Sequence, residues 1–147
     1  MAITVSWYGL GLQKIMQQTV NLETATVKLA LVASGYAPNR DTDDYRNLFT
    51  ANELGSGNGY TTGGYTLSGI AYSYDSASDQ VRIDCNDPTW TFTASKTWRY
   101  GVMYVDTAGA DTTDPLIALL DWGGDQTVST GYTLTIDSAG LLYLDTT

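Results

Sequence analysis

The chain contains few residues of the kinds that carry out catalysis. Histidine is absent from the sequence, which removes the most common general base and the most common metal ligand. The single cysteine, Cys85, alternates with Val81 and Ile83 in a strand-like pattern, which favours a buried apolar role over a nucleophile. Paired carboxylates are the remaining alternative, but glutamate occurs only at Glu23 and Glu53. We therefore expect no enzyme and no catalytic residue.

Clusters of aspartate offer oxygen ligands for Ca²⁺, but their spacing fits no calcium-binding loop. The cluster of Asp41, Asp43 and Asp44 lacks the glycine and the glutamate that a helix-loop-helix calcium site needs at its sixth and twelfth positions. The glycines between Gly55 and Gly64 precede no Lys-Ser or Lys-Thr pair, so they do not form a phosphate-binding loop. We expect solvated turns here, with no metal and no other cofactor.

The charge balance limits the classes of partner. Sixteen acidic residues against seven basic ones give a net charge of −9, and the basic residues are scattered along the chain. Binding to nucleic acid needs clustered Lys and Arg, so we expect neither nucleic acid nor anionic lipid as a partner. No run of 18 apolar residues and no signal-peptide pattern is present, which predicts a soluble protein without a membrane span, made in a cytoplasm.

The stretch from Trp98 to Trp122 is the central element that the sequence predicts. Residues 99–106 alternate with the period of two that turns successive side chains to opposite faces of a sheet. The return segment, residues 115–122, is nearly all apolar, which is typical of a strand covered on both faces. Residues 109–114 supply the turn between them. We expect this hairpin to lie in the middle of a sheet.

Shorter strand patterns surround this hairpin. They lie at residues 24–33, 65–74, 80–86, 88–93, 127–128, 132–137 and 141–145. About eight short strands with turns between them predict an all-β fold, an antiparallel β-sandwich or a flattened barrel. A chain of 147 residues is long enough for one such domain, which we expect to span residues 21–147.

The N-terminal residues 1–20 are expected to form a short helix or a mobile arm. Ser6 can cap a helix over residues 6–19, but Gly9 and Gly11 weaken the helical pattern. An arm that becomes ordered only against a partner is the alternative, because its large apolar side chains need a cover.

A second segment, near residues 43–50, has a short helical pattern. Asp43 is the expected cap. Three side chains are expected to face inward: Tyr45, Leu48 and Phe49. The glycine-rich residues 55–64 that follow predict a loop.

Several packing and turn motifs follow one another along the chain. They are Tyr-Ala-Pro-Asn at 36–39, a glycine-rich segment at 57–64, Trp-Thr-Phe-Thr-Ala at 90–94, Arg-Tyr-Gly-Val-Met-Tyr at 99–104, Asp-Pro-Leu-Ile at 114–117, Asp-Trp-Gly at 121–123, and the closing segments 131–136 and 140–144. In this order the chain resembles a family of small structural proteins from the virions of tailed bacteriophages. The resemblance covers nearly the whole chain.

The resemblance implies a non-enzymatic virion structural protein, synthesised in the cytoplasm of a bacterial host. The placement it favours is a capsid decoration (cement) protein, a homo-oligomer and most simply a trimer, bound to the major capsid protein on the outside of the head. A tail, head-tail connector or fibre component is the alternative, with another virion protein as partner. A carbohydrate-binding β-sandwich is a second alternative, because the sequence has eleven tyrosines and four tryptophans.

On the decoration interpretation, two places are expected to contact the partner. Trp7, Tyr8 and Leu10 are apolar residues near a terminus with little local core to cover them, although packing of a first helix on the sheet is the alternative. Tyr60 is a large aromatic residue in the glycine-rich loop, where its ring can enter a partner pocket. The alternative for that loop is an ordinary connection between strands.

Overall fold

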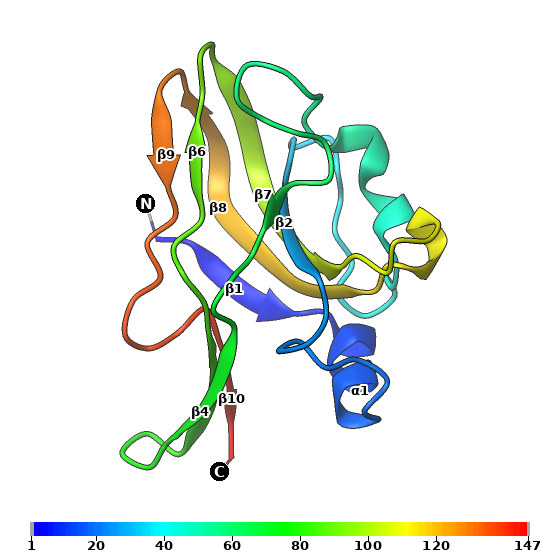
Figure 1. Cartoon of the computed structure of the whole chain (residues 1–147), viewed down its shortest axis with the longest axis vertical. Coiled ribbons are helices and arrows are strands. Elements are labelled where there is room, and N and C mark those ends of the chain that lie inside the picture. The colour runs from blue at the N-terminus through cyan, green and yellow to red at the C-terminus, as the bar shows by residue number, and fades with distance from the viewer. Residues whose placement is uncertain (1, 147) are drawn as a thin grey trace.

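The computed structural model describes residues 2–146, which form an all-β sandwich with one α-helix (Figure 1). This confirms the predicted fold class. The strands are β1 (Thr4–Trp7), β2 (Val27–Val32), β3 (Tyr65–Thr66), β4 (Ala71–Asp75), β5 (Gln80–Asp84), β6 (Thr89–Thr91), β7 (Lys96–Val105), β8 (Leu116–Val128), β9 (Gly131–Thr133) and β10 (Leu142–Asp145). The helix is α1 (Gly9–Met16), and three 3₁₀ turns are η1 (Arg46–Leu48), η2 (Thr50–Asn52) and η3 (Asp111–Thr113).

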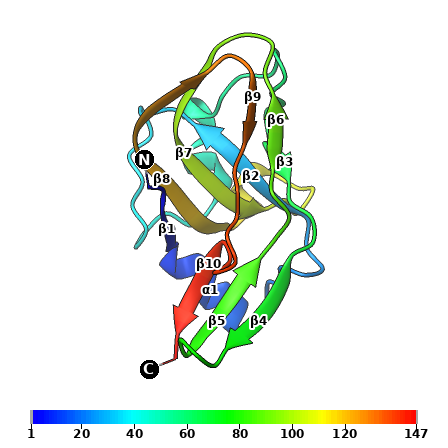
Figure 2. The same ribbon diagram turned by 90° about the vertical axis from the view of Figure 1, so that its left-hand side faces the viewer.

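The strands form three antiparallel sheets. The main sheet has the order β1-β8-β7-β2-β3, so the predicted hairpin, β7 and β8, lies in its interior as expected. Two smaller sheets, β10-β5-β4 and β6-β9, form the second layer of the sandwich. The sheet β10-β5-β4, which we call the small sheet, extends beyond the end of the main sheet, with α1 behind it (Figure 2).

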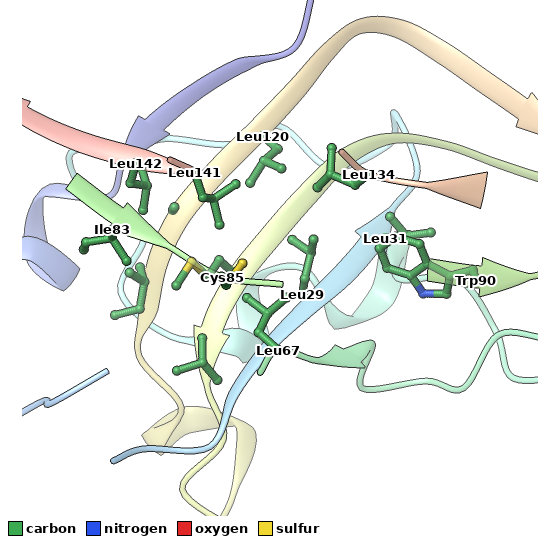
Figure 3. Close-up of a cluster of buried hydrophobic side chains, with 14 of the residues drawn as sticks. Leu29, Leu31, Leu67, Ile83, Cys85, Trp90, Leu120, Leu134, Leu141 and Leu142 are labelled. Atoms are coloured by element: carbon green, nitrogen blue, oxygen red, sulfur yellow. The ribbon is translucent and has the colours of Figure 1, made fainter. Parts of the chain in front are cut away.

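Two apolar cores cover the two faces of the main sheet. The larger core lies between the main sheet and the second layer, and it contains Leu29 and Leu120 of the main sheet and Ile83 and Leu142 of the small sheet (Figure 3). The second core lies on the other face, and its members come from β2, β7, β8, the segment 33–54 and the residue between β1 and α1: Tyr8, Ala30, Val32, Tyr36, Phe49, Tyr100, Val102, Tyr104, Leu116 and Leu119. Consecutive residues of β7 therefore enter opposite cores, as the period of two predicts.

The N-terminal residues differ from the prediction because the edge of β8 takes up a further strand. Residues 4–7 pair with β8, from Thr4 opposite Asp121 to Trp7 opposite Ala118. Ser6 therefore lies inside a strand and does not cap a helix. The helix begins only at Gly9, and no side chain caps it. Of the two alternatives, helix and arm, the structure has the helix, preceded by a strand that joins it to the domain.

The short helical segment is present as η1 and η2, but two of its contacts differ from the prediction. Asp43 does not cap it, and instead accepts hydrogen bonds from the Tyr36 hydroxyl (2.6 Å) and the Asn39 amide (2.9 Å). Phe49 is fully buried as predicted. Leu48 is not, because the chain passes through tight 3₁₀ turns rather than an α-helix and leaves 43% of this side chain exposed.

The two glycines of α1 provide a matched test of its packing. A Cβ atom at Gly11 would overlap the carbonyl oxygen of Leu116 in β8, whereas one at Gly9 would meet only the Arg40 carbonyl oxygen at 3.6 Å. We predict that Gly11→Ala lowers the free energy of unfolding by about 1–3 kcal/mol. Gly9→Ala should leave it unchanged or raise it by up to about 1 kcal/mol, since alanine favours a helix. Urea unfolding measures both, and equal stabilities would contradict close packing of α1 on β8.

Candidate interaction surface

Some polar side chains that the sequence singled out, such as Tyr60 and Asp43, form hydrogen bonds within the domain. Within residues 2–146, no group of three or more His, Cys, Asp or Glu side chains is arranged to hold a metal ion. In the same part of the chain, no helix has the length and apolar character needed to cross a membrane.

Tyr60, one of the predicted partner contacts, is buried and bonded inside the domain. Its hydroxyl accepts a hydrogen bond from the Leu31 amide and donates one to the Glu53 carboxylate, each at 3.0 Å. The Glu53 side chain is fully buried and also accepts hydrogen bonds from the Gly63 amide (2.5 Å) and from Arg46 (3.1 Å). Burial and the nearby Glu53 raise the pKa of Tyr60. The prediction for Tyr60 is therefore wrong in this structure, because its ring fills the core.

Arg46 extends this network to the connection between β7 and β8. Its second terminal nitrogen donates to Asp111 in η3 at 2.6 Å, and its guanidinium lies 5.3 Å from the ring centre of Tyr104. The Tyr104 hydroxyl donates to the Gly63 carbonyl oxygen at 2.6 Å. A buried ion pair of this kind contributes little net stability, but removal of one partner is costly. The network thus fixes the glycine-rich loop as an ordinary connection between strands.

A single hydroxyl tests this structural role. Tyr60→Phe removes the acceptor for the Leu31 amide, and an unpaired buried N–H costs about 1–3 kcal/mol. We predict a loss of unfolding free energy in that range by urea denaturation. Tyr74→Phe is the control, since Tyr74 is 58% exposed and its hydroxyl bonds only Asp79, so a change within about 0.5 kcal/mol is expected. Equal effects of the two substitutions would argue against the network.

Tyr8, another predicted contact, is also fully buried. Its amide donates to the Ile117 carbonyl oxygen at 3.0 Å, and its hydroxyl lies 2.9 Å from that of Tyr36. Burial is the main cause that raises the pKa of Tyr8. The Tyr8 side chain is not accessible to a partner, because the chain turns inward between β1 and α1 and the ring packs in the second core. The expectation for Tyr8 is thus corrected to the alternative, packing on the sheet.

Trp7 and Leu10, the other two predicted contacts, are half-buried. The indole nitrogen of Trp7 donates to the Tyr143 carbonyl oxygen at 2.9 Å, so its ring joins β1 to the small sheet. Trp7 also lines an apolar cleft between α1 and the small sheet. Leu10 lies on α1 outside the lining of that cleft. Its role as a partner contact stays a prediction.

An apolar cleft of about 290 Å³ lies between α1 and the small sheet. Figure 2 shows the two elements that form it, with the helix behind the three strands. Its lining residues come from β1, α1, β4, β5 and β10: Trp7, Leu12, Ile15, Met16, Tyr72, Val81, Ile83 and Leu144. Leu12, Ile15 and Met16 follow the spacing of one helix face, which turns this apolar stripe toward the strands.

The register of the small sheet explains why its cleft-facing side is apolar. Cross-strand pairing aligns the alternate residues into two rows: an inner row of Tyr72, Ile83 and Leu142, and an outer row of Tyr74, Val81 and Leu144. The inner row enters the larger core, where Ile83 and Leu142 are buried. The outer row projects past the main sheet, which leaves Tyr74 58% and Leu144 36% exposed. Across the cleft, Met16 is 70% exposed.

No protein-family model, curated protein or solved structure matches this chain. The cleft is therefore interpreted from its own residues. Its volume lies just below the range of about 300–1,000 Å³ that is usual for small-molecule sites. A pocket of this size with an apolar lining is suited to the anchor side chains of a protein partner.

The sequence shows the alternation of each strand, but it does not show which strands pair or how the helix lies against them. The exposure of Met16, Tyr74 and Leu144 at this surface was therefore not predicted.

Cys85 provides a separate check on the larger core. It is 8% exposed, and burial, followed by the nearby Asp84 and Asp87, raises the pKa of its thiol to about 11. Because the thiolate is the reactive form, we predict that a disulfide reagent at pH 8 labels the unfolded protein completely while the folded protein stays largely unlabelled. Fast labelling of folded protein would contradict this burial.

Proposed function

We propose that this chain is a non-enzymatic structural protein of a bacteriophage virion and that it docks on another virion protein through the cleft between α1 and the small sheet. In the placement we favour, it decorates the outer surface of the major capsid protein lattice and stabilises the head. The observation that supports docking is the set of apolar side chains left open at the cleft, above all Met16 and Leu144. The virion assignment comes from the order of motifs along the chain.

The energetics of such a contact suit a decoration protein. Covering apolar surface contributes about 25 cal/mol per Å², so the exposed parts of a few large side chains supply only a weak contact. In a shell the same contact is repeated by symmetry, and a homo-oligomer, a trimer in the simplest case, engages several lattice positions at once. Local opening of the lattice then requires the loss of several contacts together.

A tail, connector or fibre component is the second candidate. The observation that favours it is the position of β4 at the end of the sheet order β10-β5-β4, which leaves its outer edge without a partner strand among the described residues. An open edge can pair with a strand from another protein. Such a contact would use backbone groups of β4 rather than the apolar side chains of the cleft.

Electron microscopy of particles distinguishes the two placements. Purified protein is incubated with capsids that lack it and with isolated tails of the same phage, and both are imaged. We expect regular density over the shell. Density confined to the tail or to one vertex would replace the first placement by the second, and density on neither particle would overturn the virion proposal.

Three substitutions test whether the cleft is the docking surface. Met16→Ser and Leu144→Ser should each weaken binding to capsids by about tenfold, since each removes an apolar anchor worth on the order of 1–2 kcal/mol. Leu48→Ser is the matched control, because this leucine is 43% exposed and lies outside the cleft. Equal binding of all three variants would remove the cleft from the proposal, even where the capsid is decorated.

A further inference from the structure

Two exposed carboxylates lie close to the cleft, one at each apolar row of the small sheet. Glu23 lines a second hollow, which shares Ile15 and Tyr72 with the cleft. Asp79, in the turn between β4 and β5, accepts a hydrogen bond from the hydroxyl of Tyr74 at 2.9 Å. Both acidic residues are exposed, and neither has an ion-pair partner within residues 2–146. An approaching molecule therefore meets one unpaired negative charge beside the inner row, at Glu23, and one beside the outer row, at Asp79.

Two of the three basic side chains near the cleft, Arg82 and Lys14, are directed away from it. Arg82 alternates with the cleft-facing residues of β5, so it lies on the opposite face of the small sheet, paired with Asp75. The Lys14 ammonium lies 4.9 Å from the ring centre of Tyr45, away from the cleft. Arg40 borders a hollow that shares Trp7, but no residue of the outer row, with the cleft. The net charge around the cleft, Glu23 and Asp79 against Arg40, is thus negative, as is that of the whole chain.

From this combination we infer the chemistry of the occupant: the cleft binds an apolar segment of a partner protein that is flanked by Lys or Arg. Apolar side chains of the segment fill the space between α1 and the small sheet, and its basic side chains reach Glu23 and Asp79. Segments that place apolar anchors in a groove and charges at its rim are a recurrent mode of recognition. The inference rests on the proposed docking function, and it names the chemistry of the partner at that same surface.

A second copy of this chain is a poorer occupant on electrostatic grounds. A twofold contact through the cleft would place the same surface patch on both subunits. Each copy would then bring its own Glu23 and Asp79 to the interface, where like charges oppose association. Any homo-oligomer is therefore expected to use a different face of the domain.

Synthetic peptides test the inference on the free, full-length protein. The first peptide carries a leucine stripe with lysines at both ends, the second has glutamates in place of the lysines, and the third keeps the lysines but has alanines in place of the leucines. Binding is followed by NMR through the indole N–H of Trp7, which lies in the cleft and is assigned with Trp7→Phe. We expect saturable binding of the first peptide, at least about tenfold weaker binding of the second, and no shift of Trp7 with the third.

Matched variants separate the apolar part of the site from its charge. Met16→Ser should weaken the lysine-flanked peptide, whereas Leu48→Ser should not. The pair Glu23→Gln with Asp79→Asn should remove the preference for lysine over glutamate. The control pair Asp41→Asn with Asp125→Asn makes the same change of charge at exposed positions elsewhere and should keep that preference.

Three results would overturn the inference. The glutamate-flanked peptide binds as tightly as the lysine-flanked one, or the control pair abolishes the preference as fully as the rim pair, or the Trp7 resonance shifts with protein concentration alone, which would make a second copy the occupant. Since this assay contains no virus particle, its failure is distinct from a failure to decorate capsids. Peptide binding without particle binding would leave the cleft chemistry intact and remove only the virion partner.

Discussion

The pairing of β7 with β8 is the constraint on which the rest of the structure depends. Residues 116–120 of β8 and 100–105 of β7 are buried without interruption, so neither face of this pair can remain in contact with water. One face is covered by the second layer of the sandwich, and the other by the segment 33–54 together with Tyr8. The irregular segments of the chain are therefore as necessary to the fold as the strands, because they close the second core.

The two walls of the cleft, α1 and the small sheet, are held in place by different sets of contacts. The helix α1 is held by β1, by the burial of Tyr8 in the second core, and by the close approach of Gly11 to β8. The small sheet is held by its inner row, which belongs to the larger core. Because α1 is anchored through the second core and the small sheet through the larger core, the packing of the sandwich fixes the width of the cleft between them. The outer row and Met16 are left at its open end, where the described residues leave Met16, Tyr74 and Leu144 exposed.

Local patterns were sufficient to predict the central hairpin, the turn at residues 109–114 and the burial of Cys85, because each depends on neighbours in the sequence. They failed where distant residues decide. The strand Thr4–Trp7 is short and runs directly into a helical pattern, and only the free edge of β8 makes it a strand. Tyr60 lies in the larger core, where its hydroxyl accepts a hydrogen bond from the amide of Leu31, 29 residues away. The exposure of Met16 depends on how far the small sheet extends, which no local pattern contains.

The distribution of exposed apolar side chains separates the cleft from ordinary surface. Single apolar residues on a surface are normal and carry no functional meaning. Five large ones are exposed among the described residues, and three of them lie on α1 or on the cleft-facing side of the small sheet: Met16, Tyr74 and Leu144. Tyr143 lies on the opposite face of the small sheet, beside Arg82, and Leu48 lies in η1. Three exposed apolar side chains thus gather around one cleft instead of standing singly on the surface. Such a grouping is typical of a surface that another molecule covers.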